Sequence, residues 1–145
     1  MAQKFSTGLR AGMMNASGAY EQLNGGKLRI FGGAVPADAD AAETGTLLAE
    51  YTDNGDGGGL NFTSPTTPTM VKTPAQVWKE NSVNATGNAT YFRFVAAGDT
   101  AAASTTEVRV QGSAGLAGSD LVLNNVLFTS GEARTLNYFS INLPT

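Results

Sequence analysis

The chain has 145 residues, a formal net charge of −3 and 14% charged residues, against roughly 25% in an average soluble domain. This length suits one domain with one core, and the scattered Lys and Arg residues form no basic stripe for nucleic acid. The sequence contains no cysteine and no histidine, which excludes disulfides, thiolate metal sites and most hydrolytic mechanisms, so we expect no enzymatic activity, no metal and no cofactor.

The first 24 residues are expected to form a helical arm in front of a β-domain spanning residues 25–145. Phe5, Leu9 and Met13 recur at helical spacing behind Ser6, a residue suited to cap a helix. This predicts a short helix of about two turns. Its apolar stripe either docks on a neighbouring subunit or covers the open end of the chain's own sheet.

The N-terminus carries no apolar segment of the kind that a secretory signal needs. No run of about 18 consecutive apolar residues occurs anywhere in the chain. We therefore expect synthesis in the cytoplasm and no partnership with a membrane.

Residues 27–52 carry the clearest local pattern. Leu28 and Ile30 alternate with polar and aromatic neighbours, which predicts a strand over residues 27–31 with one buried face. A second period-2 segment predicts a strand over residues 46–52.

The connection between these two strands is expected to contain a short helical turn. Val35 and Pro36 are suited to begin it, because proline fixes φ, and Gly45 is suited to end it. Asp38 and Asp40 alternate near its start, where carboxylates favour the positive end of a helix, although they could also chelate an ion.

The remaining pattern is also rich in strands. Residues 89–97 are apolar on both faces, which is typical of a central strand. Residues 52–59 superficially resemble a calcium loop, but glycines fall where ligands are needed, so we expect a turn. Further strands are expected at residues 59–63, 69–72, 105–111 and 121–123, with a closing hairpin formed by residues 126–129 and 134–143.

Three predicted strands place an arginine between apolar neighbours, namely Arg29, Arg93 and Arg109. If these strands lie side by side, the arginines share a sheet face with Phe31 and Tyr91. Arginine and aromatic residues are enriched at protein interfaces, so this face is a candidate interface. The alternative is a solvated outer face on which arginine stems cover apolar surface.

Several segments resemble small structural proteins of tailed-bacteriophage virions, and together they cover most of the chain. They are patterns of fold and turn and not catalytic motifs. The segments are Ser-Thr-Gly-Leu-Arg at 6–10, Gly-Lys-Leu-Arg-Ile-Phe-Gly-Gly at 26–33, Val-Pro-Ala-Asp-Ala-Asp at 35–40, Gly-Thr-Leu-Leu at 45–48, Gly-Asn-Ala-Thr-Tyr-Phe-Arg-Phe at 87–94 and Gly-Ser-Asp-Leu at 118–121.

The resemblance implies a protein that decorates and cements the capsid shell by binding the major capsid protein. With it we expect an all-β fold, an antiparallel β-sandwich of about eight strands with a short N-terminal helix, the jelly roll being one candidate topology. Such a protein would act as a homodimer or homotrimer on the capsid exterior of the virion, after synthesis in the bacterial host cytoplasm. The expected shell contacts are Phe5, Leu9, Met13, Val35, Pro36, Asp38 and Asp40.

Two alternatives remain open. The same resemblance allows a phage tail or fibre component. A carbohydrate-binding β-sandwich module belongs to a different class and needs aromatic residues grouped on one exposed face, for which Tyr51, Trp78 and Tyr91 are the candidates. As the single tryptophan, Trp78 is expected to be a core anchor more than an interface anchor.

Overall fold

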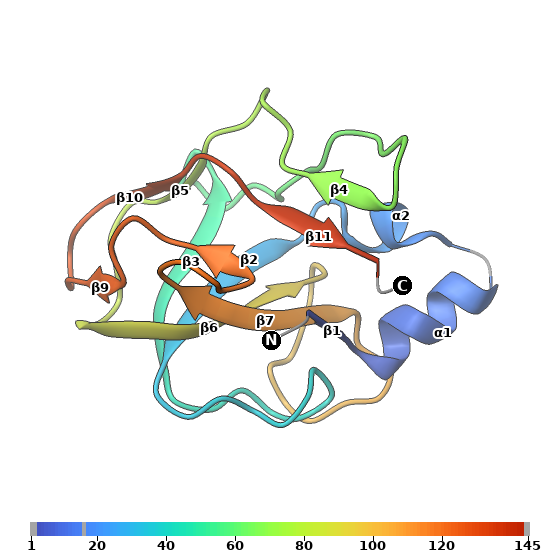
Figure 1. Cartoon of the computed structure of the whole chain (residues 1–145), viewed down its shortest axis with the longest axis horizontal. Helices are drawn as coiled ribbons and strands as arrows, with labels where there is room; N and C mark the ends of the chain where they lie inside the picture. Colours follow the sequence, from blue (N-terminus) through green and yellow to red (C-terminus); the bar gives the residue numbers. More distant parts are fainter. Residues whose placement is uncertain (1–2, 16, 144–145) are drawn as a thin grey trace.

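The computed structural model describes residues 3–15 and 17–143 and shows a mainly antiparallel β fold. Within these residues, nine strands form one large twisted sheet and two more form a small sheet that covers part of it (Figure 1). The fold is therefore sandwich-like, and the predicted all-β class with a short N-terminal helix is confirmed.

The large sheet follows a single path with two side branches. Its order is β1 (Lys4–Phe5), β7 (Arg109–Gly115), β6 (Gly87–Val95), β2 (Lys27–Gly32), β3 (Thr46–Asp53), β5 (Trp78–Glu80) and β10 (Arg134–Leu136). The branches are β8 (Leu121–Val122) beside β7 and β9 (Leu127–Phe128) beside β6, and the small sheet pairs β4 (Thr69–Val71) with β11 (Ser140–Asn142). Every described pair is antiparallel except β7 with β8.

The N-terminal segment packs on the same core as the sheet. Helix α1 (Thr7–Asn15) begins after Ser6, whose Oγ accepts the Leu9 N–H at 3.2 Å, which confirms the predicted cap. A second helix, α2 (Ala19–Leu23), follows, and Leu9 and Leu23 are both fully buried in the core. Neither helix within the described ranges is long and apolar enough to cross a membrane.

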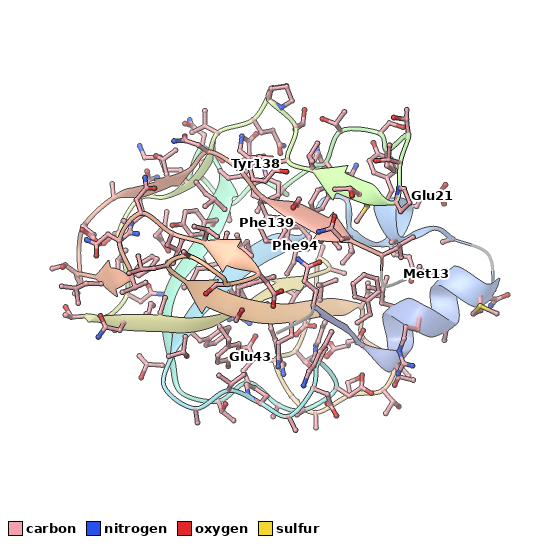
Figure 2. The ribbon with its side chains drawn as sticks, viewed as in Figure 1. Met13, Glu21, Glu43, Phe94, Tyr138 and Phe139 are labelled. Carbon is pink, nitrogen blue, oxygen red and sulfur yellow. The ribbon has the colours of Figure 1, made fainter. Side chains whose placement is uncertain are left out.

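Alternation along the central strands places the apolar core on one face of the large sheet. Leu28, Ile30, Phe92 and Phe94 are fully buried there. The small sheet covers this face, and Figure 2 shows Phe94 and Phe139 together on one side of the sheet with Glu43 on the other. Trp78 is also fully buried in this cluster, so it is a core anchor as expected.

The predicted closing hairpin is wrong. Strands β9, β10 and β11 pair with β6, β5 and β4, respectively, and not with one another. This arrangement buries Phe128, Leu136 and Phe139 in the core. A local hairpin would not bury the same apolar surface, so the observed pairings are favoured. Residues 59–63 form only isolated bridges, at Leu60 and Phe62.

Candidate functional site

The second face of the large sheet is covered by two segments of the same chain (Figure 1). One is the β2–β3 connection, residues 33–45, and the other is the β6–β7 connection, residues 96–108. They are joined by two backbone hydrogen bonds, from Glu43 N–H to the Ala101 carbonyl at 3.0 Å and from Ser104 N–H to the Asp40 carbonyl at 2.8 Å. The sheet is therefore buried on both faces at its centre.

The side chains beneath these connections include all three predicted arginines. Arg29 lies opposite Arg93 across β2 and β6, and Phe31 lies opposite Tyr91 with ring centroids 4.7 Å apart. Arg109, on β7, follows the same alternation. The prediction that these five residues share one sheet face is confirmed.

The alternative of a solvated outer face is wrong. Arg93, Arg109 and Tyr91 are 0% exposed, and Arg29 retains 18% of its side-chain exposure. Their own chain covers them, so a partner would meet the outer surface of connection 33–45 before it met these arginines. An interface role for the face stays a prediction.

Connection 33–45 is held by side chains of the sheet through consecutive backbone carbonyls. Gln111 Nε2 donates to the carbonyl of residue 36 at 2.9 Å, Arg93 Nη2 to that of residue 38 at 3.1 Å, and Arg109 Nη1 to that of residue 39 at 3.3 Å. Lys4 Nζ donates to the intervening carbonyl, that of residue 37, at 2.6 Å. These bonds satisfy the carbonyls of a segment that has no strand partner there.

Ion pairs balance the buried charge of Arg109. Arg93 is held by hydrogen bonds to Gln111 Oε1 and the Asp38 carbonyl, and its Nη1 has no hydrogen-bond partner among the described residues. Arg109 Nε lies 2.6 Å from Asp99 Oδ2, both side chains being buried, and Arg109 also contacts the Glu107 carboxylate. Burial alone would lower the pKa of Arg109, but Asp99 and Glu107 outweigh burial and raise it. Burial raises the pKa of Glu43, although Arg29 at 2.7 Å opposes the rise.

The predicted helical turn in connection 33–45 is absent, and the two aspartates have other roles. Asp38 Oδ1 accepts the backbone N–H groups of Asp40 and Ala41, each at 3.0 Å, in an Asx-type turn. The Asp40 carboxylate accepts the Thr7 N–H at 2.7 Å and the Thr7 hydroxyl, which ties the connection to the start of α1. Proline still fixes φ at position 36, but the side-chain hydrogen bonds decide the path of the chain.

Val35, Ala37 and Asp38 are exposed on the outer surface of connection 33–45, while Pro36 is buried towards the sheet. The other exposed residues of the connection are Gly33, Ala34, Ala42, Thr44 and Gly45. Of the predicted N-terminal contacts, Leu9 is buried in the core, and Phe5 and Met13 pack partly buried against it. Phe5 lies in β1, so its predicted place in the helical stripe is wrong, and only Leu9 and Met13 belong to α1. The connection is therefore the accessible part of the predicted contact set.

Sequence reasoning missed several residues of this site, Lys4, Asp99 and Gln111 among them. Gln111 shares the period-2 position of Arg109, and both side chains are 0% exposed, although polar residues at alternate positions of a strand usually face water. The three aromatic residues expected for a sugar-binding face, Tyr51, Trp78 and Tyr91, are buried and do not form an exposed platform.

Comparison of the chain with protein-family models, curated proteins and solved structures found no match. Within residues 3–15 and 17–143, no group of three or more Asp, Glu, Cys or His side chains is arranged to hold a metal ion. The candidate site therefore rests on its geometry, a loop of defined shape that is braced from beneath by buried polar side chains.

Proposed function

We propose that the chain is a virion structural protein that decorates the capsid shell, and that the outer surface of connection 33–45 contacts the major capsid protein. The observation that carries this proposal is the bracing of the carbonyls of residues 36–39 by Gln111, Lys4, Arg93 and Arg109. Burying two guanidinium groups to hold a loop has a desolvation cost, so the loop's shape is a strongly specified feature.

Bracing suits a docking role because a loop that is already ordered loses little conformational entropy on binding. The exposed tip carries Val35, which is 44% exposed, beside Ala37 and Asp38. Each such contact is small. A homodimer or homotrimer on a symmetric shell multiplies it, since later contacts form at high effective concentration.

The test compares two matched substitutions at exposed valines. Val35→Asp places a charge on the braced tip, and Val77→Asp places the same charge at a site that is 48% exposed and lies outside the connection. Undecorated shells assembled from the major capsid protein of the same virus are mixed with each variant, and co-sedimentation measures how much of the chain is bound.

We expect the unmodified chain and Val77→Asp to bind the shells and Val35→Asp to lose binding by about tenfold or more. Equal binding by the two variants would show that connection 33–45 does not contact the shell. Failure of the unmodified chain to bind would overturn the shell-binding proposal. Electron microscopy of labelled virions separates the alternative, because a tail or fibre component would be found on the tail.

A further inference from the structure

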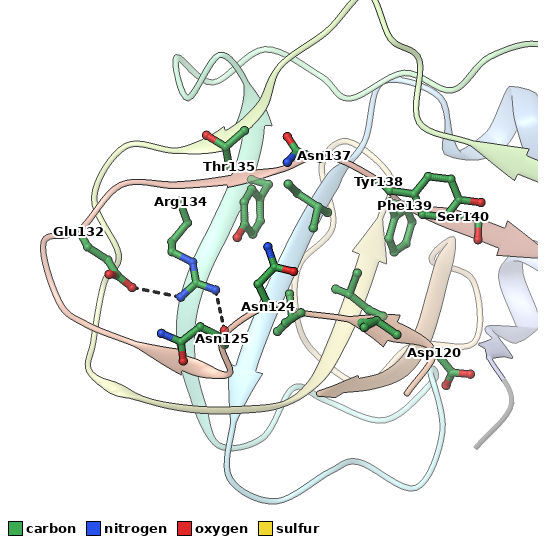
Figure 3. A pocket seen from close by; sticks show the side chains of 15 residues that line it. Asp120, Asn124, Asn125, Glu132, Arg134, Thr135, Asn137, Tyr138, Phe139 and Ser140 are labelled. Atoms are coloured by element: carbon green, nitrogen blue, oxygen red, sulfur yellow. Dashed lines mark hydrogen bonds and ion pairs between the residues drawn. The ribbon is translucent and has the colours of Figure 1, made fainter. Parts of the chain in front are cut away.

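A pocket lies away from connection 33–45, between the segment around β8 and the segment around β10 and β11 (Figure 3). Residues 120–125 form one wall, Glu132 and residues 134–140 form the other, and Tyr51 completes the lining. Its volume is about 460 Å³. Small-molecule sites in proteins span about 300–1,000 Å³, so the pocket has the size of a ligand site.

The two walls are fixed to each other by Arg134. Its Nη2 donates to the Asn125 carbonyl at 2.7 Å and its Nη1 to the Leu127 carbonyl at 3.0 Å. The guanidinium carbon also lies 3.9 Å from the ring centroid of Phe128. The pocket is therefore already formed without a ligand, which lowers the entropy cost of binding.

The lining combines an apolar floor with amide and phenol groups. Leu121, Leu136 and Phe139 are buried at the floor, whereas Asn124, Asn137 and Tyr138 are exposed, the tyrosine by 65%. Figure 3 shows Asn124 reaching into the space between the two walls. The Asn124 amide offers two donors and an acceptor, so the pocket can both donate and accept hydrogen bonds.

Charge and protonation narrow the class of ligand. Glu132 neutralises Arg134 at 3.2 Å, and Asp120 remains as a carboxylate that already accepts the Ser113 N–H at 2.9 Å. The lining thus carries more negative than positive charge, which disfavours phosphate and other anions. Burial raises the pKa of Tyr51 to about 12, so its phenol stays protonated at neutral pH.

We propose that this pocket binds a neutral saccharide, with the Asn124 amide on its hydroxyl groups and the Tyr138 ring against its C–H face. Sugars present hydroxyl donors and acceptors at the edge and weakly polar C–H groups on the face, which is the combination that amides beside an exposed aromatic ring match. The inference is independent of shell binding and uses none of the residues of connection 33–45.

The experiment is an NMR titration of the isotope-labelled full chain with a panel of maltose, lactose, mannose and diacetylchitobiose, followed at the backbone amides. We expect at least one sugar to shift the amides of residues 120–125 and 132–140 saturably at millimolar concentration. Tyr138→Ala and Asn124→Ala should each lower the affinity for that sugar about fivefold or more, because each removes a proposed contact with it. Both side chains are exposed, so their loss leaves the core intact.

Asn15→Ala and Met14→Ala serve as controls, since both side chains are exposed on α1 and outside the pocket lining. They should bind as the unmodified chain does. The proposal is overturned if no sugar of the panel shifts the pocket amides, if sodium phosphate shifts them equally, or if Tyr138→Ala and Asn124→Ala leave the affinity unchanged. It is also overturned if protein concentration alone broadens the same amides, because a second copy of the chain would then occupy the pocket.

Discussion

Arg93 and Arg109 are charged side chains without solvent exposure, and burying a charged side chain is costly unless the charge is paired. The chain offsets the cost for Arg109 with Asp99, Glu107 and the carbonyls of Ala39 and Ala102. Such a network is stable when complete, whereas removing one charged member leaves the opposite charge buried without a partner.

Arg109→Met should therefore lower the free energy of unfolding by about 3–5 kcal/mol. The substitution keeps much of the apolar stem but leaves Asp99, whose side chain is 3% exposed, without its guanidinium partner. The measurement is urea unfolding at neutral pH, in which the midpoint concentration should fall.

The double variant Arg109→Met with Asp99→Asn tests the reason for that loss. Because the amide removes the uncompensated carboxylate, the double variant should lose less stability than the sum of the two single variants. Glu21→Gln is the control at an exposed charged residue and should change stability by about 0.5 kcal/mol or less. Additive losses, or a loss under about 1 kcal/mol for Arg109→Met, would contradict the buried network.

Among the elements, helix α1 is positioned by two side chains at its first turn. Ser6 accepts the Leu9 N–H, and Asp40 of connection 33–45 accepts the Thr7 N–H. Both groups satisfy N–H donors that have no partner within the helix. The start of α1 and connection 33–45 are consequently stabilised together.

The contact between Asp40 and the start of α1 predicts that the stability of the fold depends on pH. Burial favours the protonated form of Asp40, but the hydrogen bonds from Thr7 and the charges of Arg10 and Arg109 outweigh it and hold the pKa of Asp40 below its ordinary value. The unfolded chain then binds this proton more readily than the folded chain. The contribution of Asp40 to stability is complete above the ordinary aspartate pKa of about 3.9 and is lost as the pH falls through the lower folded value.

Asp40→Asn should remove this contribution. The difference in free energy of unfolding between the unmodified chain and the variant should be constant from neutral pH down to about pH 4 and should shrink below it. Urea unfolding across this pH range measures the difference, and Asp56→Asn, at an exposed aspartate of the 52–59 turn, is the control. A difference that grows on acidification would show that the carboxylate does not stabilise this contact in its charged form.

At the scale of the whole molecule, the large sheet uses its two faces differently. One face carries the apolar core beneath the small sheet, and the other carries arginines and stacked aromatic rings beneath connections 33–45 and 96–108. The same period-2 alternation produces both faces. The fold thus encloses a polar layer as well as an apolar one.

This division explains which parts of the fold the sequence could predict. Strands β2, β3 and β6 were found to within about two residues, because alternation over several residues is a local signal. Ser6 was found as a cap for the same reason, since its partner Leu9 is three residues away.

Local patterns in the sequence could not predict the polar layer. The burial of Arg93 depends on connection 33–45 returning over the sheet, and the brace through Gln111 joins residues 75 positions apart. The pairings of β9, β10 and β11 were missed because their choice depends on where Phe128 and Phe139 find space in the core. The pocket shares this origin, since its walls come together only when those pairings form.

Phe139 joins the small sheet to the large one. Its ring centroid lies 5.3 Å from that of Phe92 and 5.6 Å from that of Trp78, so it connects the segment before β11 to the core of the large sheet. Phe139→Ala should lower the free energy of unfolding by about 3–5 kcal/mol through lost burial and a residual cavity. Tyr138→Ala, one position earlier but at a side chain 65% exposed, should change it by about 0.5 kcal/mol or less.

Thermal unfolding followed by Trp78 fluorescence and by far-ultraviolet circular dichroism measures both variants. Because the small sheet shares its core with the large one, the two signals should report a single transition at a reduced temperature in Phe139→Ala. Separate transitions would show that β4 and β11 unfold independently of the large sheet, and equal losses in the two variants would contradict the role of Phe139 in joining them.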